Sequence, residues 1–172
     1  AIIFLTYLII YVPKFDYIQG RILSFFNKET GTHNFQSDKA IDSITSGGFF
    51  GKGIGEGTLK NRVPEAHTDY IISVISEEFG VVAIMLILLL FLIFIYMVFK
   101  KISFETDDRI KLILIGSISL ILMQATIHIG VNIRLFPTTG MTLPFLSYGG
   151  SSIISTSILA GIILNLTRRK IN

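Results

Sequence analysis

Cysteine is absent from the 172 residues of this chain, and charged residues are scarce. Without cysteine, disulfide scaffolds, thiol nucleophiles and cysteine-ligated zinc sites are excluded. Charged residues make up 16% of the chain, against roughly 25% in a typical soluble domain. With 51% hydrophobic residues and a net charge of only +3, the composition argues against a disordered chain and against a basic arm that binds nucleic acid. No nucleic-acid partner is therefore expected.

Three segments of the chain are apolar and long enough to cross a membrane as helices. Residues 81–99 carry no charge, and residues 112–133 and 151–166 form a second and a third candidate. An α-helix rises about 1.5 Å per residue, so about 20 residues span the hydrocarbon core. Residues 1–12 are apolar but too short, and they are expected to be the end of a truncated helix. We predict an all-α polytopic membrane protein with the three spans, that truncated end and two outer loops, forming the C-terminal part of a longer membrane domain.

The distribution of basic residues predicts the orientation of these spans. The short connection 100–111 and the tail 167–172 are both rich in Lys and Arg. The positive-inside rule places such segments in the cytoplasm, including the C-terminus, and leaves residues 13–80 and 135–150 outside. The 13–80 segment also contains basic residues, but it exceeds the roughly 60 residues over which the rule holds.

The second candidate span carries a stripe of polar side chains. Gln124, His128 and Asn132 follow one another at intervals of four residues, which places them on one face of a helix. A polar stripe in a membrane helix faces protein or a water-filled cavity rather than lipid. Two interpretations follow from the sequence: hydrogen bonding between helices, or the lining of a substrate cavity.

The first outer segment, residues 13–80, is rich in aromatic and apolar residues and is expected to fold back onto the membrane surface. Glycines are densest in residues 47–57. We predict a tight turn there, in which the backbone passes close to a neighbouring segment or a ligand. Lys52 and Lys60 either meet a phosphate group near this turn or face water.

Residues 64–70, PEAHTDY, place two carboxylates, an imidazole and a hydroxyl close together. Thr68 or Asp69 is expected to cap a helix that continues through Gly80 into the 81–99 span. Alone, this pattern is a weak signal and fits a capped helix with a salt bridge better than it fits a catalytic site. Carboxylates together with a substrate phosphate also leave a hard cation such as Mg²⁺ open as a ligand.

The second outer loop contains two prolines and three glycines between residues 135 and 152. These residues interrupt any continuous helix, and irregular backbone at membrane depth is tolerated only beside protein or a cavity. Hydroxyl groups and free backbone N–H groups in this loop would suit phosphate or sugar oxygens. A simple re-entrant turn is the alternative.

The motifs of both outer loops resemble the SEDS family (shape, elongation, division and sporulation), the membrane peptidoglycan polymerases. The resemblance lies in residues 47–60, 64–70, 77–80, 137–145 and 147–152. Their order, their spacing and their positions relative to the predicted spans all agree, and the resemblance covers essentially the whole chain. The stretch FQxDKAI and the form TGMTLP are more similar to the division-type branch than to the elongation-type branch. Two departures are Arg134, where a small or apolar residue is expected, and Ser76, where alanine is common.

The resemblance implies polymerisation of lipid II, the undecaprenyl-pyrophosphate-linked disaccharide-pentapeptide, into glycan strands. Asp69 matches the family's essential outer-loop aspartate and is assigned as the general base. The resemblance implies substrate contacts from ten further residues, the basic ones toward the pyrophosphate: Glu65, His67, Thr68, Lys60, Lys52, Arg21, Ser147, Gly149, Gly150 and Ser151. No certain cofactor is implied, and a divalent cation, Mg²⁺ or Mn²⁺, stays open. Arg134 would add a phosphate contact or alter the outer cavity.

The resemblance also implies partners and a location. The partners are a class B penicillin-binding protein with transpeptidase activity and other membrane proteins of the division machinery, at the septum of the bacterial cytoplasmic membrane. Two alternatives to a glycosyltransferase remain at this point, a lipid II flippase and a non-catalytic scaffold of that machinery. The uncharged 81–99 span favours the enzyme, because a transporter needs polar groups through the membrane interior. Whether this chain acts without further spanning helices is open.

Overall fold

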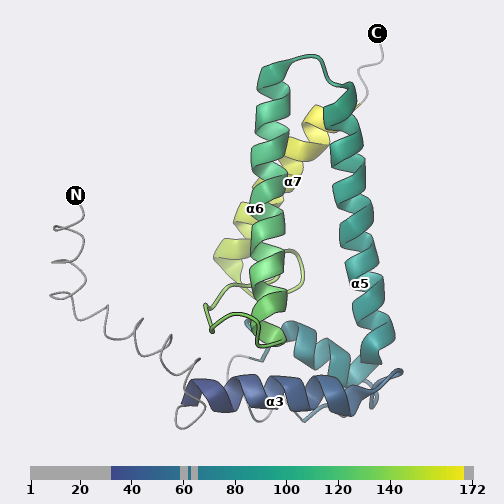
Figure 1. Cartoon of the computed structure of the whole chain (residues 1–172), viewed down its shortest axis with the longest axis vertical. Coiled ribbons are helices and arrows are strands. Elements are labelled where there is room, and N and C mark those ends of the chain that lie inside the picture. The colour runs from purple at the N-terminus through teal and green to yellow at the C-terminus, as the bar shows by residue number, and fades with distance from the viewer. Residues whose placement is uncertain (1–31, 59–61, 63–65, 169–172) are drawn as a thin grey trace, which may run out of the picture.

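A computed structural model describes residues 32–58, 62 and 66–168 of the chain, and these residues are helical or irregular, without a strand. The helices are α3 (Thr32–Gly47), α5 (Ile71–Phe104), α6 (Asp108–Asn132) and α7 (Gly150–Thr167) (Figure 1). Three of them, α5, α6 and α7, are long and apolar enough to cross a membrane. The predicted all-α membrane fold with three spans is therefore confirmed. The expected helix end at residues 1–12 lies outside the described residues.

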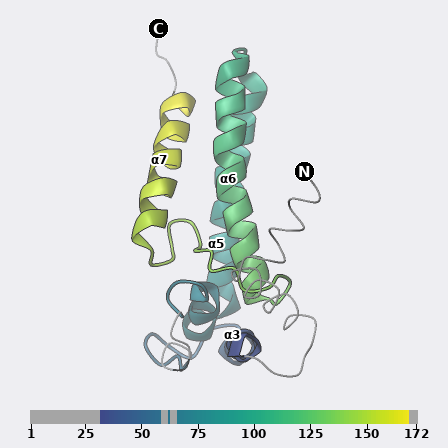
Figure 2. The ribbon, with the colours of Figure 1, turned by 90° about the vertical axis from the view of Figure 1, so that its left-hand side faces the viewer.

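The spanning helices stand side by side, and α3 lies across one end of them. Figure 1 shows α5 and α6 upright, with α3 nearly perpendicular to both at the lower end. Figure 2 shows α7 next to α6, joined to it by a long irregular connection. An apolar cluster at the far end joins the three helices through Val98 of α5, Leu114 and Ile118 of α6, and Ile163 of α7. Most other apolar side chains of α5 are exposed on the protein surface, as expected for a membrane-spanning helix that is hydrophobic on all sides and contacts lipid.

A short polar turn connects α5 to α6 at the end far from α3. The Asp107 carboxylate accepts a hydrogen bond from the Arg109 N–H at 2.9 Å and so caps α6. Glu105 pairs with Lys101 at 2.8 Å. The hydrogen bond from the Lys101 ammonium lowers the pKa of the Glu105 carboxyl below its ordinary value. Acidic and basic side chains thus neutralise one another in the connection.

Helix α5 begins at Ile71 and is interrupted once, at Gly80, which has φ 79° and ψ −177°. The prediction that Thr68 or Asp69 caps this helix is wrong. The N-cap is Tyr70, and it makes no side-chain capping hydrogen bond. The reason is that the chain forms a separate turn over residues 66–70 before the helix starts. The helix does continue through Gly80 into the span, as expected, but with a kink.

The backbone groups freed by the kink are hydrogen-bonded by residues 47–53, which we call the kink clasp. Without such partners, the carbonyls before a helix break and the N–H groups after it stay unsatisfied. Four backbone bonds connect the clasp to both sides of the break: Lys52 N to Glu77 O (2.8 Å), Gly53 N to Glu78 O (3.1 Å), Val81 N to Gly48 O (3.0 Å) and Val82 N to Phe49 O (3.4 Å). The clasp therefore connects the end of α3 to the kink of α5.

The clasp requires glycine because backbone approaches backbone. A Cβ on Gly51 would lie 2.2 Å from the Glu78 carbonyl oxygen, and one on Gly80 would lie 2.2 Å from the Phe49 carbonyl oxygen. Both glycines also have positive φ, 76° and 79°, a region that side-chain-bearing residues rarely adopt. The predicted tight turn with close backbone approach in the glycine-rich segment is confirmed.

Ser76, beside the clasp, offers a test of this packing. Among the described residues, its hydroxyl is the buried side-chain polar atom that lacks a hydrogen-bond partner. An unpaired buried polar group costs about 1–3 kcal/mol. Ser76→Ala is therefore expected to raise the Tm of the detergent-solubilised protein. Ser73→Ala is the matched control and should lower it, because the Ser73 hydroxyl donates to Asn132 at 2.7 Å. A lower Tm in Ser76→Ala would mean that the hydroxyl has a partner.

Candidate active site

A polar pocket of about 390 Å³ opens between α6, the start of α7 and the loop that joins them. Hydroxyl, amide and glycine backbone groups dominate its lining: Gln124, Gly140, Met141, Thr142, Gly149, Ser151, Ser152 and Ser155. Such groups offer neutral donors and acceptors, which suit the oxygens of a sugar or a phosphate. The pocket contains two of the residues expected to border a substrate, Gly149 and Ser151.

Gln124 connects three parts of this pocket. Its side-chain amide donates to the Thr142 carbonyl at 2.9 Å and lies 3.2 Å from the Thr142 hydroxyl. It also reaches the Ser152 hydroxyl at 3.1 Å, and the two hydroxyls are 2.6 Å apart. This residue of the polar stripe therefore makes a hydrogen bond between helices and also lines a cavity, and the binding of a substrate in that cavity stays a prediction.

The turn over residues 66–70 is held by the carbonyl oxygens of three consecutive residues. His67 O accepts from Tyr148 N at 3.1 Å, Thr68 O from the Ser147 hydroxyl at 2.7 Å, and Asp69 O from the Asn132 amide at 2.9 Å. The His128 ring nitrogen Nε2 also lies 3.4 Å from Thr68 O. The donors come from α6 and from the loop before α7. The main chain around Asp69 is thereby fixed to both.

The Asp69 side chain is half-buried and points to the edge of the polar pocket. Its Oδ2 lies 3.6 Å from the position that a Cβ on Gly140 would take. Gly140 lines the pocket and has φ 70°, so its lack of a side chain leaves room beside the carboxylate. An acidic group thus stands next to a cavity of neutral hydrogen-bonding groups. This is a suitable position for a general base that receives a proton from a bound hydroxyl.

The remaining predicted site residues lie in several places. His67, two residues before Asp69, is exposed, and Thr68 is half-buried. Ser147 is buried behind the turn, where its hydroxyl also accepts from Leu143 N at 2.8 Å. Gly150 begins α7. Arg21, Lys60 and Glu65 lie outside the described residues. Their roles stay predictions.

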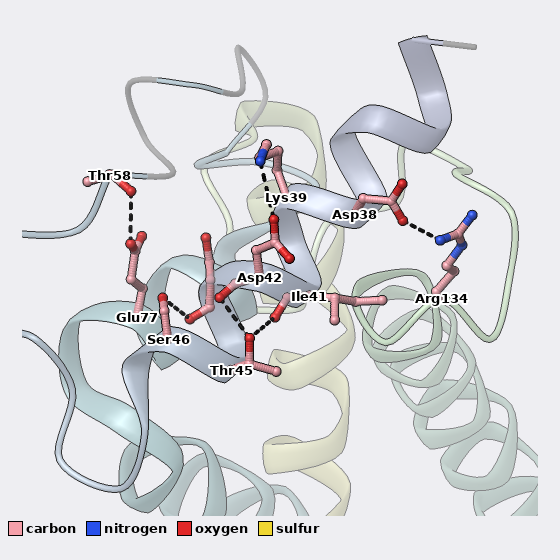
Figure 3. A network of polar contacts seen from close by, with 10 residues as sticks. Asp38, Lys39, Ile41, Asp42, Thr45, Ser46, Thr58, Glu77 and Arg134 are labelled. Carbon is pink, nitrogen blue, oxygen red and sulfur yellow. Dashed lines mark hydrogen bonds and ion pairs between the residues drawn. The ribbon is translucent and has the colours of Figure 1, made fainter. Parts of the chain in front are cut away.

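Lys52 lies in a second, charged cavity of about 250 Å³ between α3, the clasp and α5. Its ammonium is 2.9 Å from Glu77 Oε1. The Thr58 hydroxyl donates to the same oxygen at 3.1 Å, as Figure 3 shows. Glu77 is 1% exposed, so this carboxylate needs a compensating charge. Lys52 therefore stabilises the buried Glu77 carboxylate. Its expected contact with a pyrophosphate stays a prediction.

Removing the Lys52 charge tests this stabilisation. Lys52→Met removes the Lys52 cation from the buried Glu77 carboxylate, and we expect a loss of about 2 kcal/mol in the free energy of unfolding, less than for a fully buried pair because the lysine is partly exposed. The double variant Lys52→Met/Glu77→Gln should recover most of the loss. Thermal unfolding in detergent measures both. An unchanged Tm in Lys52→Met would contradict this account and leave ligand binding as the lysine's role.

Arg134 forms a long-range ion pair with Asp38 (Figure 3). This pair connects the segment after α6 to α3, so the Arg134 side chain makes a contact within the protein.

Among the described residues, no group of three or more His, Asp or Glu side chains is arranged to hold a metal ion. A divalent cation at the site would therefore need ligands from a substrate or from other parts of the protein.

Comparison with known proteins places the chain in a family. A family model described as "Cell cycle protein", covering FtsW, RodA and SpoVE, matches residues 1–172. The chain belongs to this family. It is therefore part of a multi-pass membrane protein of the SEDS type, as the motifs of its outer loops indicate.

Individual relatives support the same family assignment. The chain is 38% identical over 158 residues to a probable peptidoglycan glycosyltransferase FtsW of Caulobacter vibrioides, covering 91% of this chain and 40% of that protein. It is 36% identical over 172 residues to a protein of the same description in Geobacter metallireducens, covering 98% and 46%. A solved structure on the structural coordination of polymerization and crosslinking by a peptidoglycan synthase complex matches with TM-score 0.68 and 26% identity, covering 92% and 43%. The chain thus spans less than half the length of these relatives.

Proposed function

We propose that this chain is the C-terminal part of a peptidoglycan glycosyltransferase that polymerises lipid II during bacterial cell division. The observation that carries the proposal is the Asp69 carboxylate beside Gly140, at the edge of a polar pocket and on a turn fixed through three carbonyl oxygens. The FtsW descriptions of the relatives support the same activity.

The reaction transfers a glycosyl group between two lipid-linked sugars. The acceptor hydroxyl oxygen attacks the anomeric carbon of the donor, and the bond from that carbon to the lipid pyrophosphate breaks. Asp69 accepts the proton that leaves the hydroxyl. The donors of the polar pocket hold the sugar oxygens, and positioning contributes because the two reacting atoms must meet at near contact distance.

The loop before α7 also suits a substrate with a polar head and an apolar tail. One side of this loop faces the polar pocket. Its other side, residues 144–146, lines an apolar pocket of about 320 Å³ together with Ile87, Leu90, Phe91 and Phe94 of α5. An isoprenoid chain fits such a surface, whereas a soluble sugar nucleotide would not use it. The two pockets support lipid II as the substrate class.

Asn132 serves as a positioning residue in this proposal. It is fully buried, donates to the carbonyls of Asp69 and His128 at 2.9 Å each, and accepts from the Ser73 hydroxyl at 2.7 Å. Asn132→Asp replaces the donor by an oxygen that faces two carbonyl oxygens, so we expect lipid II turnover to fall by about 10-fold to 100-fold. Ser103→Ala, an exposed change on α5, should leave turnover unchanged. Wild-type turnover in Asn132→Asp would remove Asn132 from the account.

The same proposal assigns the partners and the location. The partner is a class B penicillin-binding protein that crosslinks the new strands, and other division proteins join at the septum. The basic connection 100–111 and the C-terminus lie in the cytoplasm, and the two pockets face outside. A divalent cation near the pyrophosphate is compatible with this arrangement.

Reconstitution of the full-length protein with its transpeptidase partner tests the function against its alternatives. Lipid II is supplied in the vesicle membrane, and products are separated on a gel. Glycan strands support the glycosyltransferase. Fluorescent lipid II that crosses the bilayer without strands would support a flippase, and neither result from a folded complex would support a scaffold; both would overturn the proposal.

A further inference from the structure

We propose that Phe49 and Phe50, at the tip of the kink clasp, insert into the lipid interface at the outer surface of the membrane. The two residues are 74% and 87% exposed, and Ile54, four residues on, is 80% exposed. Monomeric soluble surfaces rarely gather large apolar side chains in this way. This inference concerns an interaction surface and does not depend on the catalytic assignment.

The height of this tip relative to the membrane is fixed by hydrogen bonds. Val81 N donates to Gly48 O at 3.0 Å, and Val82 N donates to Phe49 O at 3.4 Å. Val81 and Val82 begin the uninterrupted part of α5, the candidate span with the highest hydropathy. Figure 1 shows the segment after α3 at the lower end of α5. The two phenylalanines therefore lie level with the point where α5 enters the membrane.

The lipid surface is the occupant because the tip continues the apolar surface of the span. Val82 is 54% exposed and Phe79 46% exposed, and Met85 and Leu86 extend the exposed apolar surface along α5. The charged residue of the clasp, Lys52, pairs with the buried Glu77. Apolar side chains of segments that lie at the membrane surface are buried about 5–10 Å deep, at the boundary between headgroups and acyl chains.

Electron paramagnetic resonance on the full-length protein tests this proposal. The chain contains no cysteine, so a nitroxide label can be placed at Phe50→Cys in a background in which any other cysteine is replaced. Glu56→Cys, exposed in the segment that follows the clasp, is the matched control. Molecular oxygen concentrates in the bilayer, and a water-soluble nickel chelate stays outside it.

The expected result is a ratio of oxygen to nickel collision rates several-fold higher at position 50 than at position 56. A low ratio at position 50, equal to that at position 56, would overturn the proposal because the tip would face water. A label that neither reagent reaches would also overturn it, since another part of the protein or a partner chain would then cover the tip.

Discussion

Gly80→Ala and Gly51→Ala are expected to abolish folding of the protein to its native state. Each added methyl group would lie 2.2 Å from a backbone carbonyl oxygen, of Phe49 and of Glu78 respectively. Backbone atoms cannot rotate away as a side chain can, so the kink and the clasp would have to separate. The positive φ at both positions adds further strain. We expect the free energy of unfolding to fall by more than about 4 kcal/mol. The variants should then give no monodisperse protein in detergent and no cooperative thermal unfolding transition.

Two other glycines provide the matched controls. A Cβ on Gly116 or Gly161 would meet nothing within 4 Å, and both residues lie inside helices α6 and α7. Gly116→Ala and Gly161→Ala should therefore keep the free energy of unfolding within about 1 kcal/mol of wild type or raise it, because alanine favours helix. Normal folding of Gly80→Ala would show that the clasp does not hold the kink as described.

Asp69→Asn is expected to lower the rate of glycan-strand synthesis by at least about 100-fold, the usual effect of losing a general base. The asparagine keeps the shape of the side chain but does not take up a proton at neutral pH. The turn should stay in place, because the hydrogen bonds to the carbonyl oxygens of His67, Thr68 and Asp69 are main-chain contacts that this substitution does not remove. Steady-state lipid II turnover by the full-length protein with its partner measures the effect.

The matched control for that prediction is Asp42→Asn. Asp42 lies on α3, where its carboxylate pairs with Lys39 at 3.2 Å and is largely exposed. An exposed pair contributes little, so turnover should stay within about two-fold of wild type. Equal losses in both variants would point to general damage at the outer face, and equal retention would remove Asp69 from the chemistry.

The spanning helices and the glycine turn could be predicted from sequence because each has a local signature. An apolar run predicts α5 wherever the rest of the chain lies. Glycine density at residues 47–57 predicts close backbone approach, although it does not tell which segment approaches. That partner, the kink at Gly80, is defined by hydrogen bonds across about thirty residues of sequence.

Helix α3 could not be predicted in this way. Its sequence, THNFQSDKAIDSITSG, is polar and has little helical periodicity. It is stabilised by contacts that lie far away in the chain. Ala40 packs against Tyr70 and Val74, and Asp38 pairs with Arg134. Tertiary burial, rather than local propensity, decides such a helix.

The candidate site was predictable in its residue types and not in its connections. The motif around Asp69 and the polar stripe of α6 are both visible in the sequence. The sequence does not show that Asn132 and His128 contact the carbonyls of Asp69 and Thr68. Every residue has a carbonyl, so the sequence does not indicate which carbonyl accepts a given hydrogen bond. The structure therefore adds the positioning, and the sequence supplies the chemistry.

Lipid II binding and strand synthesis, measured on the same preparation of Asp69→Asn with its partner, test the central claim most directly. The claim is that Asp69 acts on the acceptor hydroxyl rather than holding the substrate. It predicts lipid II affinity within about three-fold of wild type, together with a rate of strand synthesis at least about 100-fold lower. Strand synthesis at the wild-type rate, or a loss of strands explained wholly by a loss of lipid II binding, would contradict it.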